Sequence, residues 1–289
     1  MPKGDVLVLG AGPAGMACAY ELARHGIPAR VVERNREVGG LCRTLSYEGF
    51  LFDIGGHRFL SKLPEVNALW KDMLDGDLLR VPRKSRIFYR GRFFGYPLAL
   101  AETLRGLGLA ESLRCLASCL RGRYFSEVDE STLEGWMVKR FGRRLFESFF
   151  KTYTEKVWGM PCREISSTWA AQRIEGLSLG QAIRKALFPR SNGSIRTLSR
   201  SFYYPRLGPG LFYQRLQQAS EKHGATFLLE TELESMGWNG RGISYVALRT
   251  RRSIETLAAP RHVFSSIPLP HLLRKLDPPP PREILEAAR

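Results

Sequence analysis

Three glycines near the start of the chain have the spacing with which a backbone turn can hold phosphate groups. Gly10 permits a tight turn, Gly12 lets a pyrophosphate approach the backbone, and Gly15 lets a helix pack closely on a strand. The N-terminus of that helix faces the phosphates with a partial positive charge. The turn predicted to bind phosphate consists of Gly10, Gly12, Pro13, Ala14 and Gly15.

An acidic residue follows at the position that this chemistry requires. The pattern predicts a buried strand at residues 5–9, a helix at 13–25 and a second strand at 29–33, which ends at Glu33. A carboxylate there accepts hydrogen bonds from the ribose hydroxyls of an adenosine. A purely structural glycine turn would not need Glu33. The combination therefore predicts a βαβ unit that binds a dinucleotide.

Two further glycine pairs lie downstream of this unit. Residues 39–40 come soon after the predicted ribose carboxylate, and residues 55–56 directly precede His57. An imidazole is polar and titrates near neutral pH, so His57 is a candidate for proton transfer or hydrogen bonding at a site. The alternative is a structural histidine that is hydrogen-bonded within the fold.

The segments around these pairs resemble a known family. Residues 33–44 (ERNREVGGLCRT) resemble the extended fingerprint of flavoproteins of the glutathione-reductase-like superfamily, specifically its amine oxidase and protoporphyrinogen oxidase branch. Residues 52–59 (FDIGGHRF) are similar to the segment that passes the isoalloxazine in that branch, and to the Gly-Pro-His segment of UDP-galactopyranose mutases. Residues 151–159, 166–179 and 203–210 extend the resemblance over nearly the whole chain.

The resemblance implies FAD as the cofactor and assigns further contacts to it. Many relatives carry Arg directly after the second glycine pair, where this chain has Leu41, and Arg43 takes that role here. The strand around Leu233 corresponds to one that passes the adenine by main-chain contacts. His57 and Arg58 are the implied catalytic residues beside the flavin. The cofactor contacts implied beyond the first turn are Glu33, Arg34, Gly39, Gly40, Arg43, Gly55, Gly56, His57 and Leu233.

The predicted fold class is α/β: a discontinuous Rossmann-type FAD-binding domain with an inserted, mainly helical substrate domain. Residues 1–61 form its first part, 62–200 the inserted domain and 201–289 an incomplete second part. Within these ranges we expect a hairpin at 86–96, a helical pair at 99–121, and a helix at 131–152 capped by Ser131. The second part is expected to contain a helix at 209–223 and strands at 225–236, 243–250, 253–258 and 262–267.

Composition excludes several classes of protein. The 289 residues are 44% hydrophobic and 25% charged, as in globular proteins, so the chain is not disordered, collagen-like or a coiled-coil rod. Five scattered cysteines argue against a disulfide scaffold and favour a reducing cytoplasm. Cys115 and Cys119 are expected to be structural thiols. The histidines show no metal-ligand spacing, so no metal is expected.

The net charge of +16 requires anionic partners. Lys and Arg are spread along the chain without a nucleic-acid-binding motif, so we expect a small, anionic substrate and no nucleic acid. The amphipathic stretch 99–121, with Arg105, Arg114, Arg121 and Arg123 on or beside it, allows peripheral contact with an anionic membrane. No run is long and apolar enough to predict a spanning helix.

Aromatic and basic residues in the second half are candidates for a substrate cavity, although aromatic side chains are more often core. The aromatic candidates are Tyr153, Trp158, Trp169, Tyr203 and Tyr204. The basic candidates are Lys156, Arg163 and Arg173, which can hold carboxylates or phosphates or can belong to a solvated face.

The leading hypothesis is an FAD-dependent oxidoreductase in which a small-molecule substrate delivers hydride to the flavin. A flavin-dependent mutase similar to UDP-galactopyranose mutases is the first alternative, and an inactive FAD-binding remnant is the second. Members of the family are longer and have a closing segment with a Gly-Asp or Gly-Arg element, whereas residues 271–289 contain no glycine. We therefore expect the site to need a further C-terminal partner segment.

Overall fold

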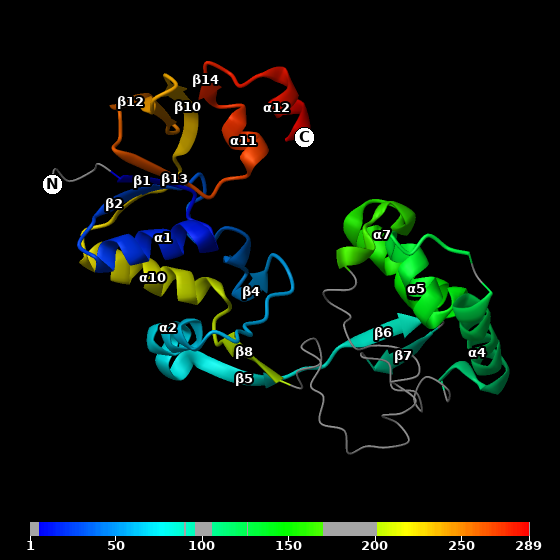
Figure 1. Ribbon diagram of the computed structural model, residues 1–289. Helices are drawn as coiled ribbons and strands as arrows, with labels where there is room; N and C mark the ends of the chain where they lie inside the picture. The colour runs from blue at the N-terminus through cyan, green and yellow to red at the C-terminus, as the bar shows by residue number, and fades with distance from the viewer. Residues whose placement is uncertain (1–5, 90, 96–105, 126, 170–200, 289) are drawn as a thin grey trace. The chain divides into compact units, whose positions relative to one another are not determined.

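The computed structural model describes residues 6–89, 91–95, 106–125, 127–169 and 201–288 (Figure 1). The chain forms two compact units: unit 1 comprises Met1–Val81 and Phe202–Arg289, and unit 2 comprises Pro82–Ser201. This division places residues 62–81 in unit 1, whereas the sequence suggested a boundary after residue 61. The reason is that Leu74 is fully buried in the core of unit 1, with Trp70 packed against the same cluster.

A parallel sheet forms the centre of unit 1, and its strands occur in the order β13-β1-β2-β9. The strands are β1 (Val6–Leu9), β2 (Ala29–Val32), β9 (Thr226–Leu228) and β13 (His262–Ser265). All four residues of β1 are buried, as expected for a strand covered on both faces. The α/β class predicted from the sequence is confirmed.

Alternate residues of the central strands enter different cores. Val6, Val8 and Val31 pack with helices α1 (Pro13–Arg24) and α10 (Gly210–Lys222), which lie side by side against the sheet (Figure 1). Leu7, Leu9 and Val32 pack against a second sheet. This sheet has the order β12-β11-β10-β14. Its strands are β10 (Glu232–Trp238), β11 (Ile243–Arg249), β12 (Ile254–Ala258) and β14 (Leu276–Asp277).

The strand expected over residues 225–236 is wrong as a single element. The chain leaves β9 at Leu228 and enters β10 at Glu232, so the two strands belong to different sheets. Glu230 between them has φ +51°, a left-handed conformation that turns the chain. Nothing in the sequence indicated this turn, because the strand-forming residues run continuously through it.

The remaining elements of unit 1 connect these sheets or surround them. Strands β3 and β4 pair with each other, as do β5 and β8. These elements are η1 (Gly40–Cys42), β3 (Thr44–Tyr47), β4 (Phe50–Asp53), α2 (Pro64–Leu74), η2 (Asp75–Asp77), β5 (Leu78–Pro82), β8 (Ser201–Pro205), α11 (Leu269–Leu273) and α12 (Arg282–Ala287).

Unit 2 is mainly helical in its described part. The hairpin predicted at 86–96 is confirmed by the pairing of β6 (Arg86–Tyr89) with β7 (Arg92–Gly95). Of the predicted pair at 99–121, residues 99–105 lie outside the described residues, and residues 109–121 belong to α4 (Leu109–Tyr124). The other elements are α5 (Leu133–Phe141), α6 (Arg143–Phe146), η3 (Glu147–Lys151), α7 (Thr152–Trp158) and η4 (Cys162–Glu164).

The single helix expected at 131–152 with a Ser131 cap is corrected in two respects. The residue that caps α5 is Thr132, whose Oγ1 accepts a hydrogen bond from Gly135 N at 3.1 Å. The helix then ends before Gly142, which has φ +80°. A Cβ on Gly142 would lie 2.5 Å from the backbone N of Cys119 in α4, so the break permits close packing of two helices.

The glycine turn itself provides a test of the fold. Because a Cβ on Gly15 would lie 1.9 Å from the carbonyl oxygen of Gly10, Gly15→Ala should lower the free energy of unfolding by about 1–3 kcal/mol. Urea titration followed by circular dichroism measures this loss. Gly76→Ala is the matched control, since Gly76 has open space around it and should change stability by less than about 0.5 kcal/mol. Equal stability of both variants would contradict the packing described.

Candidate functional site

The turn between β1 and α1 is held from several sides. Gly10 has φ +95°, and its N–H donates to Val32 O at 2.8 Å. Ser266 Oγ donates to the carbonyl oxygens of Leu9 and Gly10, at 3.1 Å each. A Cβ on Gly10 would lie 2.7 Å from Ser266 Oγ. The requirement for glycine at position 10, like that at position 15, therefore comes from contacts within the protein.

Gly12 differs from its two neighbours in the motif. Its backbone is extended, with φ −72° and ψ −179°, a conformation open to any residue. The nearest atom that a Cβ there would meet is the Cα of Gly40, at 4.0 Å. The described protein therefore leaves space beside Gly12, directly at the N-terminus of α1. This space suits a ligand that must touch the backbone.

The second glycine pair lies against the first turn. Gly39 N donates to Ala11 O at 2.7 Å, and a Cβ on Gly40 would lie 2.9 Å from the Cα of Gly12. The guanidinium of Arg43 donates to Gly40 O at 3.2 Å. Two loops that are separate in sequence thus form one backbone surface, and the close approach requires glycine at position 40.

Glu33 connects this surface to the end of β2. Its side chain is buried, with 6% of the residue exposed. One carboxylate oxygen accepts from Ala11 N at 2.8 Å, and the other accepts from the backbone N of Asn35 at 2.9 Å and from Asn35 Nδ2 at 2.5 Å. These donors compensate the buried charge. Since a carboxylate has about four acceptor positions, Glu33 retains capacity for one further donor.

A small cavity of about 210 Å³ lies beyond Glu33 and contains Arg34. Glu230 in its wall is paired with Arg36 at 2.8 Å and with Arg251 at 2.6 Å. The hydrogen bond from the Arg36 guanidinium lowers the pKa of Glu230 from its usual value. The lining residues are Arg34, Glu230, Glu232, Arg249, Thr250 and Arg251. This cavity therefore has cations and carboxylates in its wall.

Leu233 follows Glu232 in β10. Its side chain is buried in the core between the two sheets, so only its backbone is available for contact with a ligand. Thr231 N donates to Glu33 O at 3.0 Å, which brings the start of β10 to the end of β2. The structure thus brings together the two segments to which the sequence assigned the adenosine, the end of β2 and the start of β10.

A second cavity, of about 170 Å³, contains the two residues predicted to be catalytic. His57 and Arg58 line it, and the exposed glycines 55 and 56 precede them. Trp70 forms part of the wall and is stacked between Phe59 and Phe212, with ring centroids 4.0 and 4.1 Å apart. The lining residues are Cys42, His57, Arg58, Phe59, Trp70, Tyr204, Pro205, Pro209 and Tyr213.

Two tyrosines in the wall of this cavity have raised pKa values. The hydroxyl of Tyr204 donates to Asp53 Oδ2 at 2.8 Å. Burial and this carboxylate raise the pKa of Tyr204 to about 12. Burial, followed by its interaction with Cys42, also raises the pKa of Tyr213 above the usual tyrosine value. Both phenols therefore carry their protons at neutral pH, and the proton of Tyr204 is used in its bond to Asp53.

At this cavity, two buried polar atoms lack hydrogen-bond partners among the described residues: His57 Nδ1 and Asp53 Oδ1. Buried polar atoms without a partner are rare in folded proteins because each one loses its hydrogen bonds to water. His57 lines the cavity, and Asp53 is bonded to a residue that does so. These atoms have the unsatisfied bonding capacity expected of a site that receives a ligand.

Sequence reasoning missed several residues of this site. Asp53, Trp70 and Tyr213 were not predicted as site residues, although Asp53 lies within the segment 52–59 that contains the third glycine pair. Thr44 was also missed: its Oγ1 accepts from Gly210 N at 3.0 Å and so anchors the start of α10. No signal in the sequence distinguishes Trp70 or Thr44 from ordinary helix and strand residues.

Other candidates lie elsewhere. Of the aromatic candidates, Tyr204 lines the cavity, whereas Tyr153, Trp158 and Trp169 belong to unit 2. In unit 2 the rings of Trp158 and Trp169 meet edge to face, with centroids 5.2 Å apart. Lys156 and Arg163 are also in unit 2, and Arg173 lies outside the described residues.

All five cysteines are free thiols. Burial raises the pKa of Cys115 and Cys119 above the usual thiol value, which suits the structural role expected of both. The described ranges contain no group of three or more candidate metal ligands. None of the described helices has the length and hydropathy to cross a membrane.

The sequence profile described as "Flavin containing amine oxidoreductase" matches residues 13–289, and the chain belongs to this family. It is 26% identical over 277 residues to phytoene desaturase of Phycomyces blakesleeanus, covering 88% of this chain and 47% of that protein. It is 23% identical over 205 residues to mitochondrial protoporphyrinogen oxidase of Nicotiana tabacum, covering 64% of this chain and 40% of that protein. The chain thus spans about half the length of these curated relatives or less.

Solved structures share the fold. A crystal structure of reduced UDP-galactopyranose mutase superposes with a TM-score of 0.79 at 24% identity, over 96% of this chain and 57% of that one. Putrescine oxidase bound to putrescine superposes with a TM-score of 0.58 at 17% identity, over 98% of this chain and 62% of that one. The family predicted from the glycine motifs is therefore confirmed, as is its Rossmann-type fold.

The bond between Tyr204 and Asp53 can be tested through stability. Tyr204→Phe leaves a carboxylate oxygen without its donor and should cost about 1–3 kcal/mol in the free energy of unfolding. Since the pKa of Tyr204 is raised by folding, its stabilising effect is present below about pH 10 and is lost as pH rises through about 12. Between about pH 10 and 12, the free energy of unfolding of Tyr204→Phe should therefore fall less than that of the native protein.

Denaturant titrations at several pH values measure both effects. Tyr203→Phe is the matched control, because no hydrogen bond from the Tyr203 hydroxyl is found within the described part of the chain. A double-mutant cycle with Asp53→Asn isolates the coupling between the two side chains. A coupling energy near zero would show that the bond does not contribute.

Proposed function

We propose that unit 1 binds FAD and that the protein is an oxidoreductase that removes hydride from a small organic substrate. The observation that carries this proposal is the space beside Gly12, enclosed by the second glycine pair and adjacent to the buried Glu33. Gly12 is the one glycine of its motif that the surrounding protein atoms do not require. A bound pyrophosphate that contacts the backbone there would explain why residue 12 is a glycine.

The residues present fit this cofactor. The N-terminus of α1 and the backbone at Gly12 and Gly40 would hold the phosphates, and Glu33 would receive a ribose hydroxyl. Arg34 and the backbone near Leu233 would receive the adenosine. When bound, the flavin supplies the hydride chemistry that amino-acid side chains lack, and the protein supplies position and electrostatics.

The chain's own groups in the cavity of His57 would bind and orient the substrate. Tyr213 is protonated at neutral pH and would donate a hydrogen bond, whereas Tyr204, whose proton bonds to Asp53, would accept one. The Arg58 guanidinium adds a positive charge suited to an anionic group, and the stacked Trp70 provides an apolar wall that excludes water. His57 Nδ1, buried without a partner among the described residues, would hydrogen-bond to the substrate or the cofactor.

A sugar-nucleotide mutase without net oxidation is the second candidate. Two observations favour it: the similarity of residues 52–59 to the Gly-Pro-His segment of such mutases, and the unpartnered His57 Nδ1 within that segment. The positive charge of Arg58 would suit a diphosphate. The superposition on the reduced mutase shows a shared fold and does not by itself favour this candidate's chemistry.

Cofactor binding is tested with Gly12→Ala. The extended backbone accepts alanine, so thermal stability should stay within a few degrees of the native value. The methyl group would occupy the space expected for pyrophosphate and weaken FAD binding at least tenfold, or about 1.4 kcal/mol. Quenching of FAD fluorescence measures the affinity. Gly76→Ala serves as the control and should bind like the native protein.

Two results would reject the proposal. If the purified chain shows no flavin absorbance even after FAD is added, this chain alone is a remnant without a functional cofactor site. If FAD binds equally well to Gly12→Ala, the cofactor is held elsewhere.

Anaerobic stoichiometry distinguishes the oxidoreductase from the mutase. Phytoene and protoporphyrinogen, the substrates suggested by the relatives' names, are suitable first probes for loss of the visible absorbance of oxidised flavin. If the amount of flavin reduced equals the amount of product formed, the result supports an oxidoreductase. Conversion of UDP-galactopyranose by the pre-reduced protein, without consumption of reductant, would instead establish the mutase reaction.

A further inference from the structure

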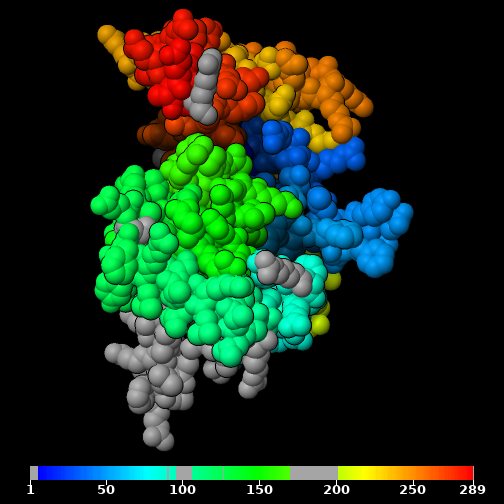
Figure 2. Space-filling model, turned by 90° about the vertical axis from the view of Figure 1, so that its right-hand side faces the viewer, coloured from blue at the N-terminus to red at the C-terminus, as the bar shows by residue number. Residues whose placement is uncertain are grey.

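Helix α4 of unit 2 presents large apolar side chains to solvent. They recur at intervals of three or four residues, so at 3.6 residues per turn they fall within about 80° of arc. Their exposed fractions range from 43% for Leu116 to 78% for Leu109. The members of this stripe are Leu109, Leu113, Leu116, Leu120 and Tyr124, and the exposed Phe125 follows directly. Atoms of this part of the chain, green in Figure 2, are visible on the surface of unit 2.

The buried face of the same helix is made of small residues. Ser112, Cys119 and Gly122 are buried there. A Cβ on Gly122 would lie 2.5 Å from Val138 O of α5, so the two helices approach each other as closely as glycine allows. This close packing leaves no room for leucines on the inner face. The outward position of the apolar stripe is therefore fixed by the structure.

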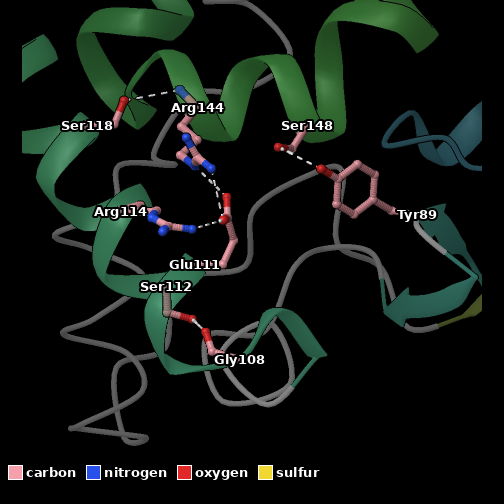
Figure 3. A network of polar contacts seen from close by, with 8 residues as sticks. All are labelled: Tyr89, Gly108, Glu111, Ser112, Arg114, Ser118, Arg144 and Ser148. Atoms are coloured by element: carbon pink, nitrogen blue, oxygen red, sulfur yellow. Dashed lines mark hydrogen bonds and ion pairs between the residues drawn. The ribbon is translucent and has the colours of Figure 1, made fainter.

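Polar contacts hold α4 in this orientation (Figure 3). Glu111 accepts two hydrogen bonds from the guanidinium of Arg144 and pairs with Arg114 at 3.5 Å. The backbone N of Arg144 donates to Ser118 Oγ at 3.1 Å. The Arg144 guanidinium lowers the pKa of Glu111, which stays ionised at neutral pH. The one acidic side chain of α4 is thus neutralised by its neighbours and adds no free negative charge to the surface.

Arginines border the stripe on both sides. Arg114 and Arg121 lie along one edge, and Arg123 lies along the other, with its guanidinium 5.7 Å from the ring centroid of Tyr124. All three are exposed. Arg114 is paired with Glu111, whereas Arg121 and Arg123 have no ion-pair partner among the described residues. The surface therefore combines an apolar strip with positive charge at its borders, the pattern of a helix that lies in the plane of a membrane interface.

We propose that the outer face of α4 binds the surface of an anionic lipid bilayer. The leucines would enter the boundary between headgroups and acyl chains, and the arginines would contact lipid phosphates. With 16 residues, more than half of them polar or small, α4 is suited to lie on a membrane rather than to cross it. A second copy of the chain is a poorer occupant, because a symmetric contact would bring arginines with the same charge together.

Vesicle co-sedimentation of the full chain tests this proposal. Binding is expected to vesicles of phosphatidylglycerol and phosphatidylcholine, to be weaker on pure phosphatidylcholine, and to fall as salt is raised. Leu113→Gln/Leu120→Gln should lower the partition coefficient at least about tenfold. Arg121→Gln/Arg123→Gln should lower it about tenfold to thirtyfold on anionic vesicles, with little change on neutral ones.

The matched control is Ile254→Gln/Leu269→Gln, which replaces equally exposed apolar residues in unit 1 and should bind vesicles like the native chain. Circular dichroism and thermal unfolding confirm that each variant is folded. Absence of native binding to anionic vesicles, or equal losses in the control, would overturn the proposal. So would a native dimer, seen by light scattering, that Leu113→Gln/Leu120→Gln dissociates. FAD binding by all variants should remain native, which separates this test from that of the proposed function.

Discussion

The carbonyl oxygen of Gly10 occupies the place where a Cβ on residue 15 would be, and the rest of unit 1 depends on this approach. It lets α1 begin directly at the end of β1, so the helix N-terminus lies at the edge of the parallel sheet. The backbone of Gly12 is then turned toward Gly40, and the second loop can close on the first through the bond from Gly39 to Ala11. A methyl group at position 15 would push the helix away and open this surface.

The placement of charge follows from the same arrangement. Glu33 can be buried because the turn supplies the Ala11 N–H and the chain after β2 supplies two donors from Asn35. Around the cavity of His57 the protein satisfies fewer of its own polar atoms. Asp53 has one oxygen satisfied by Tyr204 and one without a partner among the described residues. The first site is internally complete apart from one acceptor position, whereas the second keeps bonding capacity for a ligand.

The strong positive charge of the chain has several locations in the structure. Some arginines are paired with carboxylates, as Arg144 is with Glu111 and Arg36 with Glu230. Others border the apolar stripe of α4, where the partner proposed is a lipid surface. The two proposed partners, FAD and an anionic bilayer, would account for these cationic surfaces, so no nucleic acid is needed to explain the charge.

The sequence by itself determined the glycine turns, Glu33, the βαβ unit and the family, because each depends on residues close together in the chain. Turn chemistry and the alternation of apolar residues act over a few positions and can be read directly. His57 was also found locally, from the glycine pair before it.

Only the tertiary structure decided which distant groups meet. Tyr204 and Asp53 are 151 positions apart, and Thr44 and Gly210 are 166 apart, so their hydrogen bonds exist only after both parts of unit 1 have assembled. The division of residues 225–236 between two sheets, and the break at Gly142, likewise depend on partners that packing supplies. The outward leucines of α4 have the same origin: an amphipathic pattern specifies two faces, and the close contact at Gly122 decides which one is buried.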